Sequence, residues 1–456
     1  MKRETARQKG RAVSGSFRPR AAPAPAAAPD APPRLWVRTV RIDEPVDLLG
    51  HIPESVTAAW LRHGQGLVAI GTAWSVQTAG PHRFTAAAAA FQSLAGAARV
   101  DDEVRSAVSG LLALGSFSYA AASQRPSTLT VPRAVLGVQE GEAFLTLADA
   151  EGEPAPPPSW RDLFPSTPRP TGHASDPTGP DIEPDHTPQE YQRLVRQAVA
   201  QIREGVAEKV VLSETTTVRT EAPILPAVLL ARLAHAYPST WTYLVDDVIG
   251  ASPEMLAQTS EGRLFSRVLA GTRSVSDDGE LTVEDRRAFQ HDAKERLEHA
   301  YAVDSVTSRL EDLTTDLTSS PEPFVLRLPG LEHLASDVSA QLRPGVTSVE
   351  VAERLHPSAA VSGTPREDAD AVIENLEPHD RAGYASPVGW VNARGDGQWA
   401  IALRMAHLLD EHTVRLQAGG GLVAASDPVS EHAEVLAKNR PMLRALRGRG
   451  DEASTR

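Results

Sequence analysis

The stretch 187–213 reads TPQEYQRLVRQAVAQIREGVAEKVVLS and predicts a helix that leads into a strand. Thr187 and Glu190 have the spacing of a capping box, and the proline between them suits the first helical position. Apolar residues then recur at helical spacing, and Gly205 is placed to end the helix. The apolar run that begins at Lys209 is typical of a strand.

The rest of the chain predicts a mixture of helices and strands. Short apolar segments bounded by turn residues predict strands at 36–40, 66–70, 133–138, 242–248, 264–269, 399–404 and 413–418. Helical spacing predicts helices at 85–97, 285–310, 347–356, 366–376 and 428–446. Since the two kinds do not alternate one for one, a doubly wound parallel sheet is disfavoured. We expect an α+β fold with layered, mostly antiparallel sheets and flanking helices.

Composition divides the chain into five parts. Residues 1–34 are rich in Arg, Ala and Pro, which predicts a disordered tail, and a partner-binding arm is the alternative. An N-terminal sheet portion is expected over 35–150, followed by a Pro-rich connection at 151–186. The larger C-terminal portion then covers 187–448, and 449–456 form a short tail.

Overall composition excludes several classes of function. The chain has 456 residues and no cysteine, which excludes disulfides, thiolate metal sites and cysteine nucleophiles. A net charge of −13 argues against nucleic acid or an anionic membrane as the main partner. No apolar run is long enough to span a bilayer, and no signal peptide is recognisable, so we expect a cytoplasmic protein.

Two side chains are candidates for acid–base chemistry. Lys209 opens an apolar strand, where partial desolvation would lower its pKa and make the neutral amine available as a base. Glu254 ends the stretch GASPE (250–254), in which Gly250 and Pro253 predict a tight turn. If buried there, Glu254 would keep a proton and act as a general acid. The alternatives are a solvated lysine at a strand edge and a glutamate at a helix start.

Two Glu-x-x-Glu pairs are candidates for a metal site. Glu295 and Glu298 project from one face of a predicted helix. Glu431 and Glu434 do the same on another predicted helix, and Lys438 lies on the same face as this second pair. Oxygen-only ligands suit a hard cation such as Mg²⁺, which relies on one or two carboxylates and keeps several waters. The alternative is two solvated, charged helix faces.

Three further features are candidates for anion binding or catalysis. Gly419, Gly420 and Gly421 follow a predicted strand, and such a triplet allows backbone amides to cradle an anion. Arg404 ends another predicted strand and can bind a carboxylate through two hydrogen bonds. His333 is either a catalytic group or a histidine with a structural role.

The order and local sequence of these features resemble the chorismate-binding enzyme family, which comprises isochorismate, salicylate, anthranilate and aminodeoxychorismate synthases. The matching stretches are EKVVLS (208–213), GASPE (250–254), LAGT (269–272), KERLEH (294–299), HLASDV (333–338), LHPSAAVSGTPR (355–366), ENLEPHDRAGYASPVGW (374–390), IALR (401–404), QAGGGLV (417–423) and SDPVSEHAEVLAK (426–438). They lie in the family's order, and the region from residue 187 onward covers more than half of the chain. Residues 35–150 resemble more loosely the N-terminal portion of bacterial isochorismate synthases.

The resemblance implies a fold like that of anthranilate synthase component I and a chorismate-binding catalytic portion over 187–448. It implies that Mg²⁺ is held by Glu298 and Glu434, with Glu295 and Glu431 beside or behind them through waters. The metal would bind the ring carboxylate of chorismate.

The resemblance also implies the groups that bind the remainder of the substrate. The side-chain carboxylate would be held by Arg404, by the amides of Gly419 to Gly421 and by Tyr384. Lys438 would balance Glu434 or contact the region of the metal-bound carboxylate. The remaining substrate-binding positions that it implies are Ala270, Gly271, Thr272 and His333.

By the same resemblance, Lys209 would take a proton from water that attacks ring carbon C2, and Glu254 would protonate the hydroxyl that leaves C4. Relatives that use ammonia lack the lysine at position 209. The aminodeoxychorismate enzymes carry a lysine where this chain has Ala270. Both positions favour water as the nucleophile, and LHPSAAVSGTP and ASPVGW favour an actinobacterial-like isochorismate synthase of menaquinone or siderophore biosynthesis.

Two other functions remain as alternatives: a salicylate synthase, which eliminates pyruvate from isochorismate, and a non-catalytic chorismate-binding paralogue. We expect a monomer that needs no glutamine amidotransferase subunit and binds neither nucleic acid nor membrane. The sequence departs from common family residues at Glu214, His432 and Ser386.

Overall fold

A computed structural model describes residues 33–150, 152–167, 179–274, 282–328 and 331–447. The two predicted tails lie outside the described residues, apart from residues 33 and 34. Part of the predicted Pro-rich connection, residues 151 and 168–178, also lies outside them. None of the described helices combines the length and apolarity that a transbilayer helix needs.

The strands are β1 (Trp36–Ile42), β2 (Val56–Arg62), β3 (Gln65–Ile70), β4 (Trp74–Thr78), β5 (Arg99–Asp102), β6 (Leu112–Ser116), β7 (Ser127–Val131), β8 (Ala134–Gln139), β9 (Glu142–Asp149), β10 (Asp181–Pro184), β11 (Lys209–Arg219), β12 (Trp241–Val245), β13 (Val248–Ser252), β14 (Met255–Ser260), β15 (Arg263–Ser274), β16 (Thr314–Ser319), β17 (Phe324–Leu328), β18 (Leu331–Leu342), β19 (Gly363–Thr364), β20 (Pro387–Asn392), β21 (Gly397–Ile401), β22 (Met405–Leu408) and β23 (Thr413–Leu422). The α-helices are α1 (Arg83–Ala97), α2 (Pro188–Arg203), α3 (Pro226–Ala236), α4 (Val283–Gln290), α5 (Ala293–Leu310), α6 (Ser348–Leu355), α7 (Arg366–Leu376) and α8 (Pro428–Arg447). Two short 3-10 helices are η1 (Leu48–His51) and η2 (Trp160–Asp162).

The described strands form two large sheets, which confirms the expected α+β fold. The larger sheet has the order β10-β11-β23-β22-β13-β12-β2-β3-β8-β9-β1-β5, with β19 beside β11. The smaller has the order β16-β18-β15-β14-β21-β20-β6-β7-β4, with β17 beside β18. Among the described pairs, β1 with β5 is parallel and the others are antiparallel. In each sheet the strands of the C-terminal portion therefore lie next to one another, and the strands from 36–149 continue the sheet as a second block.

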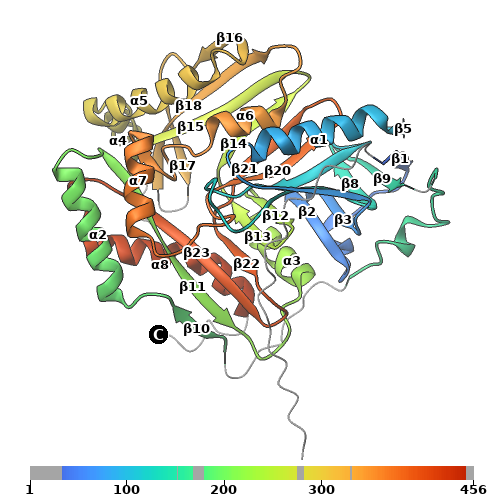
Figure 1. Cartoon of the computed structure of the whole chain (residues 1–456), viewed down its shortest axis with the longest axis horizontal. Helices are drawn as coiled ribbons and strands as arrows, with labels where there is room; N and C mark the ends of the chain where they lie inside the picture. The colour runs from blue at the N-terminus through green and yellow to red at the C-terminus, as the bar shows by residue number, and fades with distance from the viewer. Residues whose placement is uncertain (1–32, 151, 168–178, 275–281, 329–330, 448–456) are drawn as a thin grey trace, which may run out of the picture.

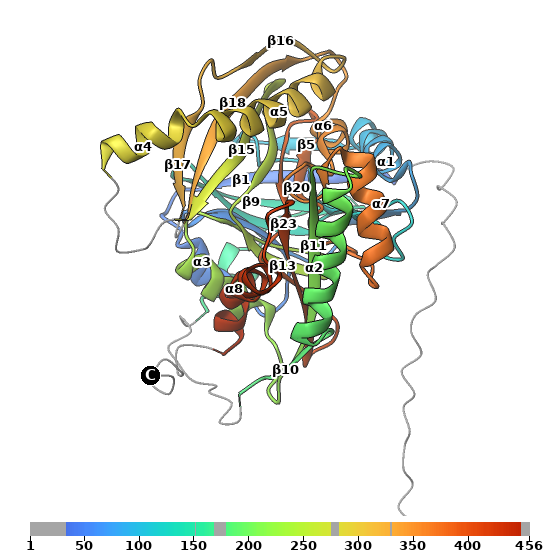
Figure 2. The same cartoon turned by 90° about the vertical axis from the view of Figure 1, so that its left-hand side faces the viewer.

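The two sheets pack face to face over one core. Its buried residues include Trp60 and Leu67 of the larger sheet, and Leu114 and Trp399 of the smaller. A second cluster lies on the other face of the larger sheet, against α3 and the end of α8. A third joins α2, α7 and α8 to β11 and β23. Figure 1 shows α5, α6 and α1 along the upper side of the molecule, and Figure 2 shows α2, α7 and α8 gathered around β11 and β23.

The predicted helix–strand unit at 187–213 is confirmed. The backbone amide of Thr187 donates to Glu190 Oε2 at 2.8 Å, and the amide of Glu190 donates to Thr187 Oγ1 at 3.3 Å, which completes the capping box. Helix α2 ends before Gly205, whose φ of +81° is a conformation that glycine adopts at little cost. The following strand is longer than predicted, because β11 continues to Arg219.

Three predicted elements were wrong in their bounds. The strand predicted at 242–248 is a hairpin of β12 and β13 that turns at Asp246, where φ is +59°. The helix predicted at 285–310 is two helices, because Asp292 caps the start of α5 by accepting a hydrogen bond from the amide of Glu295. The strand predicted at 399–404 ends at Ile401.

Candidate active site

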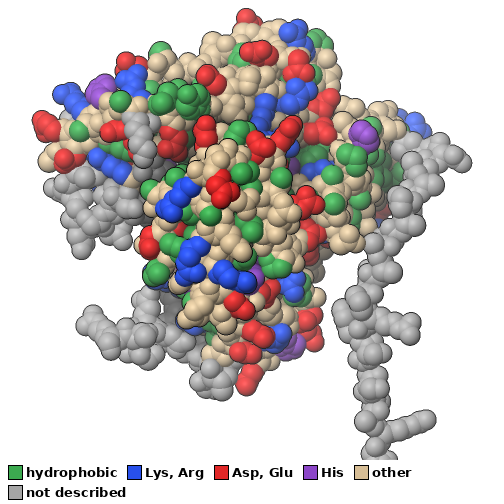
Figure 3. All heavy atoms as spheres, turned by 60° about the vertical axis from the view of Figure 1, so that its left-hand side comes forward, with side chains coloured by type: hydrophobic (Ala, Val, Ile, Leu, Met, Phe, Trp, Pro, Cys, Tyr) green, Lys and Arg blue, Asp and Glu red, His purple; other side chains and the backbone are tan. Residues whose placement is uncertain are grey.

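A cavity of about 420 Å³ lies where β11, β15, α5 and the loop before β19 meet. Lys209, Glu254, Ala270 and Glu298 line it, so four predicted site residues from distant parts of the chain share one space. Figure 3 shows acidic and basic side chains interspersed over one face of the molecule. An anionic ligand would therefore depend on cations that are local to its site.

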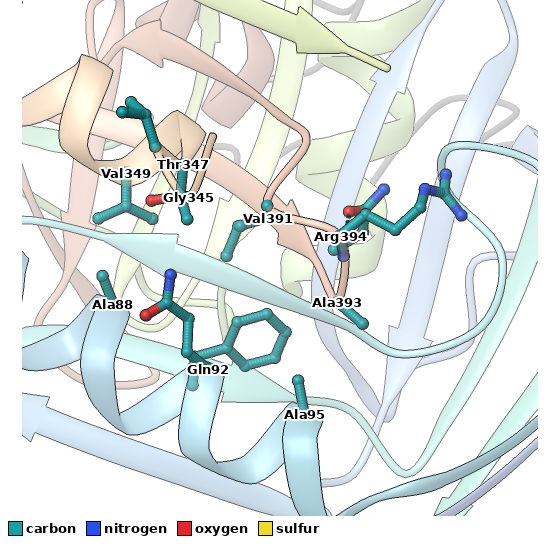
Figure 4. A pocket seen from close by; sticks show the side chains of 13 residues that line it. Ala88, Gln92, Ala95, Gly345, Thr347, Val349, Val391, Ala393 and Arg394 are labelled. Atoms are coloured by element: carbon teal, nitrogen blue, oxygen red, sulfur yellow. Dashed lines mark hydrogen bonds between the residues drawn. The ribbon is translucent and has the colours of Figure 1, made fainter. Parts of the chain in front are cut away.

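A second cavity lies between α1 and the turn at 391–395 (Figure 4). Its volume is about 150 Å³. Among its described lining residues only Arg394 is ionisable, and none of the predicted site residues lines it. It lacks a general acid or base, so the larger cavity is the candidate active site.

Lys209 begins β11 and is half-buried at the cavity. Strand β11 pairs with β23 in a register that sets Val211 opposite Gly421. A Cβ on Gly421 would lie 2.9 Å from Lys209 Cε, so the glycine leaves room for the lysine side chain. Burial lowers the pKa of Lys209, Glu298 and Glu254 act in the opposite direction, and Lys438 lowers it further.

Glu254 lies in the link between β13 of the larger sheet and β14 of the smaller. Its amide donates to Ser252 Oγ at 3.2 Å, and its carbonyl accepts from the amide of Ile401 at 3.0 Å. Burial raises the pKa of Glu254, while Lys209 and Lys438 oppose that rise. The predicted tight turn was wrong, because Gly250 lies inside β13, where a Cβ would be 2.5 Å from the Tyr243 hydroxyl oxygen.

Burial therefore shifts the pKa of Lys209 downward and that of Glu254 upward. Both shifts bring the pKa closer to neutral pH. A general base or a general acid is most effective when its pKa lies near the pH at which the enzyme works. The cavity thus holds a candidate base and a candidate acid.

Helix α8 brings the second glutamate pair to β23. Lys438 Nζ donates to the carbonyl of Gly419 at 2.8 Å and lies 2.7 Å from Glu434 Oε1. A Cβ on Gly420 would be 3.3 Å from Glu431 Oε2, so this carboxylate lies directly over the strand.

The strand predicted at 413–418 was too short, because β23 continues through the glycine triplet to Leu422. Gly419, Gly420 and Gly421 lie inside β23 and pair with β11, while the pairing of β22 with β23 ends at Gln417. Gly419 is required for a different reason, since a Cβ there would lie 2.6 Å from the Leu212 carbonyl oxygen.

Helix α5 brings the first glutamate pair to β15. Gly271 lies at a register shift in β15 with a φ of +75°, and a Cβ on it would be 3.2 Å from Glu295 Oε2. Glu298 is exposed and lines the cavity. The backbone of Thr272 pairs with His333 of β18, and the Thr272 side chain lies outside the described residues.

The remaining predicted residues lie near this group. Arg404 does not end a strand as predicted, because it lies in the bend between β21 and β22 with a φ of +49°. Tyr384 is buried beside Gly419, and burial raises its pKa to about 12 although Arg381 opposes the rise. Burial lowers the pKa of His333, and the charges of Lys209 and Lys438 lower it further.

Sequence reasoning missed His299, although it ends the quoted stretch KERLEH. His299 is buried, with Nδ1 3.0 Å from the Ala270 carbonyl oxygen and Nε2 2.8 Å from Ser336 Oγ. It connects α5 to both β15 and β18. In that stretch only the two glutamates, at helical spacing, indicated a function. A histidine that becomes buried has no local sequence pattern that would reveal it.

Two of the departures from family residues lie side by side. Glu214 is buried on β11, and its Oε2 is 3.5 Å from His432 Nε2 of α8. Burial raises the pKa of Glu214 to about 7, and Asp185 raises it as well. Ser386, the third departure, is buried and donates to the carbonyl of Tyr384 at 3.3 Å.

The predicted metal ligands come from separate helices. Within the described residues, no three His, Asp or Glu side chains are gathered closely enough to form a ready-made metal site. The donors are nevertheless carboxylates, and Glu298 and Glu434 are both exposed. Mg²⁺ requires few protein ligands because it keeps several waters, so the donor chemistry fits this ion.

Comparison with known proteins identifies the family. The family described as chorismate binding enzyme matches residues 54–447. The chain belongs to this family. It is 35% identical to the isochorismate synthase DhbC of Bacillus subtilis over 280 residues, which are 58% of this chain and 69% of that protein. It is 37% identical to the putative isochorismate synthase MenF of Mycobacterium tuberculosis over 256 residues, 53% of this chain and 68% of the relative.

Solved structures of chorismate binding enzymes share the fold. The isochorismate synthase DhbC of Bacillus anthracis superposes with a TM-score of 0.67 at 26% identity, covering 88% of this chain and 98% of the other. The menaquinone-specific isochorismate synthase MenF of Escherichia coli gives a TM-score of 0.72 at 23% identity, covering 92% and 96%. Anthranilate synthase component I of Streptococcus pneumoniae, at 20% identity, gives 0.62 and covers 96% of each chain. The implied component I-like fold is thus confirmed.

Proposed function

We propose that this chain is an isochorismate synthase that converts chorismate to isochorismate. The observation that carries the proposal is the presence of Lys209 and Glu254 in one cavity, with their pKa values shifted towards neutral pH by burial. The relatives named isochorismate synthase support the same reaction. The pair can activate water as a nucleophile. The amine is the base that takes a proton from water, and the carboxylic acid is the acid that protonates the leaving hydroxyl.

The reaction exchanges a hydroxyl between two ring carbons. The neutral amine of Lys209 takes a proton from water as its oxygen bonds to C2, and the ring double bond shifts. Glu254 gives its proton to the hydroxyl at C4, so that the C4–O bond breaks and water leaves. One water is consumed and one released, and proton return from Lys209 to Glu254 through solvent resets the pair.

The substrate is a dicarboxylate, so the site needs local positive charge. Arg404 and Tyr384 would bind the side-chain carboxylate, since the Tyr384 hydroxyl lies beside Gly419 and the charge of Arg404 acts on Tyr384. Lys438 adds a second ammonium group within electrostatic reach of Lys209 and Glu254. The segment Ala270–Thr272 would contact the ring beside α5, and His333, opposite Thr272, would lie next to it.

Glu298 and Glu434 would hold Mg²⁺, with Glu295 and Glu431 beside or behind them through waters. The ion would supply the charge that neutralises the ring carboxylate. Lys438 forms an ion pair with Glu434 and so compensates part of its charge.

The decisive experiment is product analysis. Purified protein with Mg²⁺ and chorismate is expected to produce isochorismate and to stop at equilibrium, as resolved by chromatography. Salicylate together with pyruvate would instead identify a salicylate synthase. Binding of chorismate without any product would identify a non-catalytic paralogue.

A further inference from the structure

Strand β11 has a gap along one of its edges. Near its start it pairs with β19, at Lys209 and Val210. Near its end it pairs with β10, from Thr216 onward. Between these strands, the amide of Val211 donates to the Ser362 carbonyl at 2.7 Å. The carbonyl of Val211 and the amide of Ser213 have no strand partner on that edge, and buried backbone groups need one.

Two side chains from the segment after α7 fill this gap. Glu377 Oε1 accepts from the Ser213 amide at 2.7 Å and from Ser213 Oγ at 2.9 Å. Arg381 Nη2 donates to the Val211 carbonyl at 2.7 Å. Together they satisfy the backbone groups that a neighbouring strand would otherwise bind.

Glu377 and Arg381 also bind each other as a two-bond ion pair. Arg381 Nε donates to Glu377 Oε2 at 2.8 Å, and Nη2 donates to Oε1 at 2.7 Å. Both side chains are only 3% exposed. Burying an ion pair has a high desolvation cost, and apolar residues often stabilise a fold at least as well. A buried pair such as this one is therefore better explained by the geometry that it fixes than by the stability that it adds.

The same guanidinium connects two walls of the cavity. One wall is β11, which begins with Lys209. The second is the loop before β19, where Arg381 Nη1 donates to the Val361 carbonyl at 2.7 Å, next to the cavity-lining Ala360. The backbone carbonyl of Arg381 also accepts from the amide of Tyr384 at 2.7 Å, which fixes Arg381 to the turn that carries this tyrosine.

We propose that Glu377 and Arg381 are positioning residues that hold the start of β11 so that the Lys209 amine faces Glu254. This role rests on the proposed function of Lys209 as a base. The pair touches neither reacting group and acts through the backbone of Val211 and Ser213. Fixing the backbone two and four residues after Lys209 limits how far the strand start can twist or shift.

Conservative variants test this role. Glu377→Gln keeps an oxygen that accepts from Ser213 but removes the charge that binds Arg381. Arg381→Lys keeps the charge but loses the planar fork that reaches two carbonyls and a carboxylate at once. Both variants are expected to lower kcat by about 10- to 100-fold, because small displacements of a catalytic group have effects of that size. KM is expected to change by less than about threefold, because the pair lies behind the binding groups.

A second readout does not depend on turnover. The fraction of Lys209 acylated by an amine-reactive reagent, measured by mass spectrometry across pH, gives the apparent pKa of this lysine. The ionisable groups that act on Lys209 are Glu298 of α5, Glu254 and Lys438 of α8, and Lys209 in turn acts on His333 of β18. In both variants the pH midpoint of Lys209 acylation is expected to rise towards that of a solvated lysine. The reason is that a less firmly held strand start lets the amine reach water.

Arg83→Lys is the matched structural control. Arg83 is buried and donates to the carbonyls of Gly80, Ser118 and Tyr119, and it makes no hydrogen bond to β11. Arg83→Lys is expected to lower Tm while the Lys209 midpoint stays in place. Unchanged midpoints in Glu377→Gln and Arg381→Lys, or a shift as large in Arg83→Lys, would overturn the positioning role. If wild-type protein makes no isochorismate, the proposed function fails, while the labelling result still decides whether the pair orients Lys209.

Discussion

Lys209 begins β11 of the larger sheet, and Glu254 lies in the link where the chain passes to the smaller sheet, yet both line one cavity. The candidate base is therefore held by the larger sheet and the candidate acid by the link between the two sheets. Their separation is set by how the two sheets pack, because a packed core resists small displacements.

Removal of either group is expected to abolish most activity. Lys209→Ala and Glu254→Gln should each lower kcat by about 10²- to 10⁴-fold, the usual contribution of a positioned base or acid. Steady-state rates of isochorismate formation measure the effect. Glu204→Gln, at the exposed end of α2, is the control and should retain wild-type rates. A Lys209→Ala enzyme as active as wild type would remove the lysine from the mechanism.

The pH profile is expected to be a plateau between two inflections. The reactive form has neutral Lys209 and protonated Glu254, so the lower of the two pKa values sets the acid limb and the higher sets the alkaline limb. Burial raises the pKa of Glu254 and lowers that of Lys209. The inflections of kcat/KM should therefore lie above about 4.3 and below about 10.4, the values of the free side chains. Inflections at those ordinary values would contradict the burial of the pair.

Metal removal is expected to stop the reaction. EDTA should abolish isochorismate formation, and Mg²⁺ should restore it. Glu298→Gln and Glu434→Gln should each raise the Mg²⁺ concentration needed for half-maximal rate, because each removes one charged oxygen ligand. Full activity in EDTA would exclude the proposed metal site.

Two glycines of β23 should respond differently to alanine. In Gly421→Ala the new Cβ meets the flexible Lys209 side chain at Cε, so kcat should fall with little change in Tm. In Gly419→Ala it meets the backbone carbonyl of Leu212, which cannot move aside, so Tm should fall by several degrees. Calorimetry and initial rates on the two variants separate these effects. Equal losses of Tm would show that the Lys209 side chain is as rigidly held as the backbone.

Glu214 should make stability depend on pH. Burial raises its folded-state pKa to about 7 from 4.5, so its protonated form is favoured in the folded protein. The stabilisation is complete below about pH 4.5 and is lost as pH rises through about 7. Glu214→Gln should therefore be more stable than wild type at pH 8 and differ little at pH 5. The gain at pH 8 is expected to be about 3 kcal/mol at most in the free energy of unfolding and to be visible as a higher Tm. A Tm difference that is the same at both pH values would show that Glu214 does not titrate in this range.

Local sequence predicted the elements that local chemistry controls. The capping box and glycine of α2 are visible in the sequence, and the structure confirms that helix. The hairpin at Asp246 carries no glycine or asparagine signal, so one continuous strand was predicted there. Asp292, which caps the start of helix α5, is hidden inside one long periodic pattern.

Long-range pairing determined what the sequence could not show. The contact between Gly421 and Lys209 depends on the register of β11 and β23, which no local pattern contains. The same holds for Glu377 and Arg381, whose partners lie about 160 to 170 residues away along the chain. The resemblance named the residues of the site, but only the fold shows which of them share one cavity.

The pairing of β11 with β23 also determines when the active site can form during synthesis. Lys209 leaves the ribosome roughly two hundred residues before Gly421, its neighbour across the sheet. At a typical elongation rate of about 5–20 residues per second, that interval lasts on the order of 10 to 40 seconds. Throughout it, one long edge of the nascent β11 has no partner, and unpaired strand edges invite aggregation. Catalytic competence would therefore appear only when the last strand and helix have emerged.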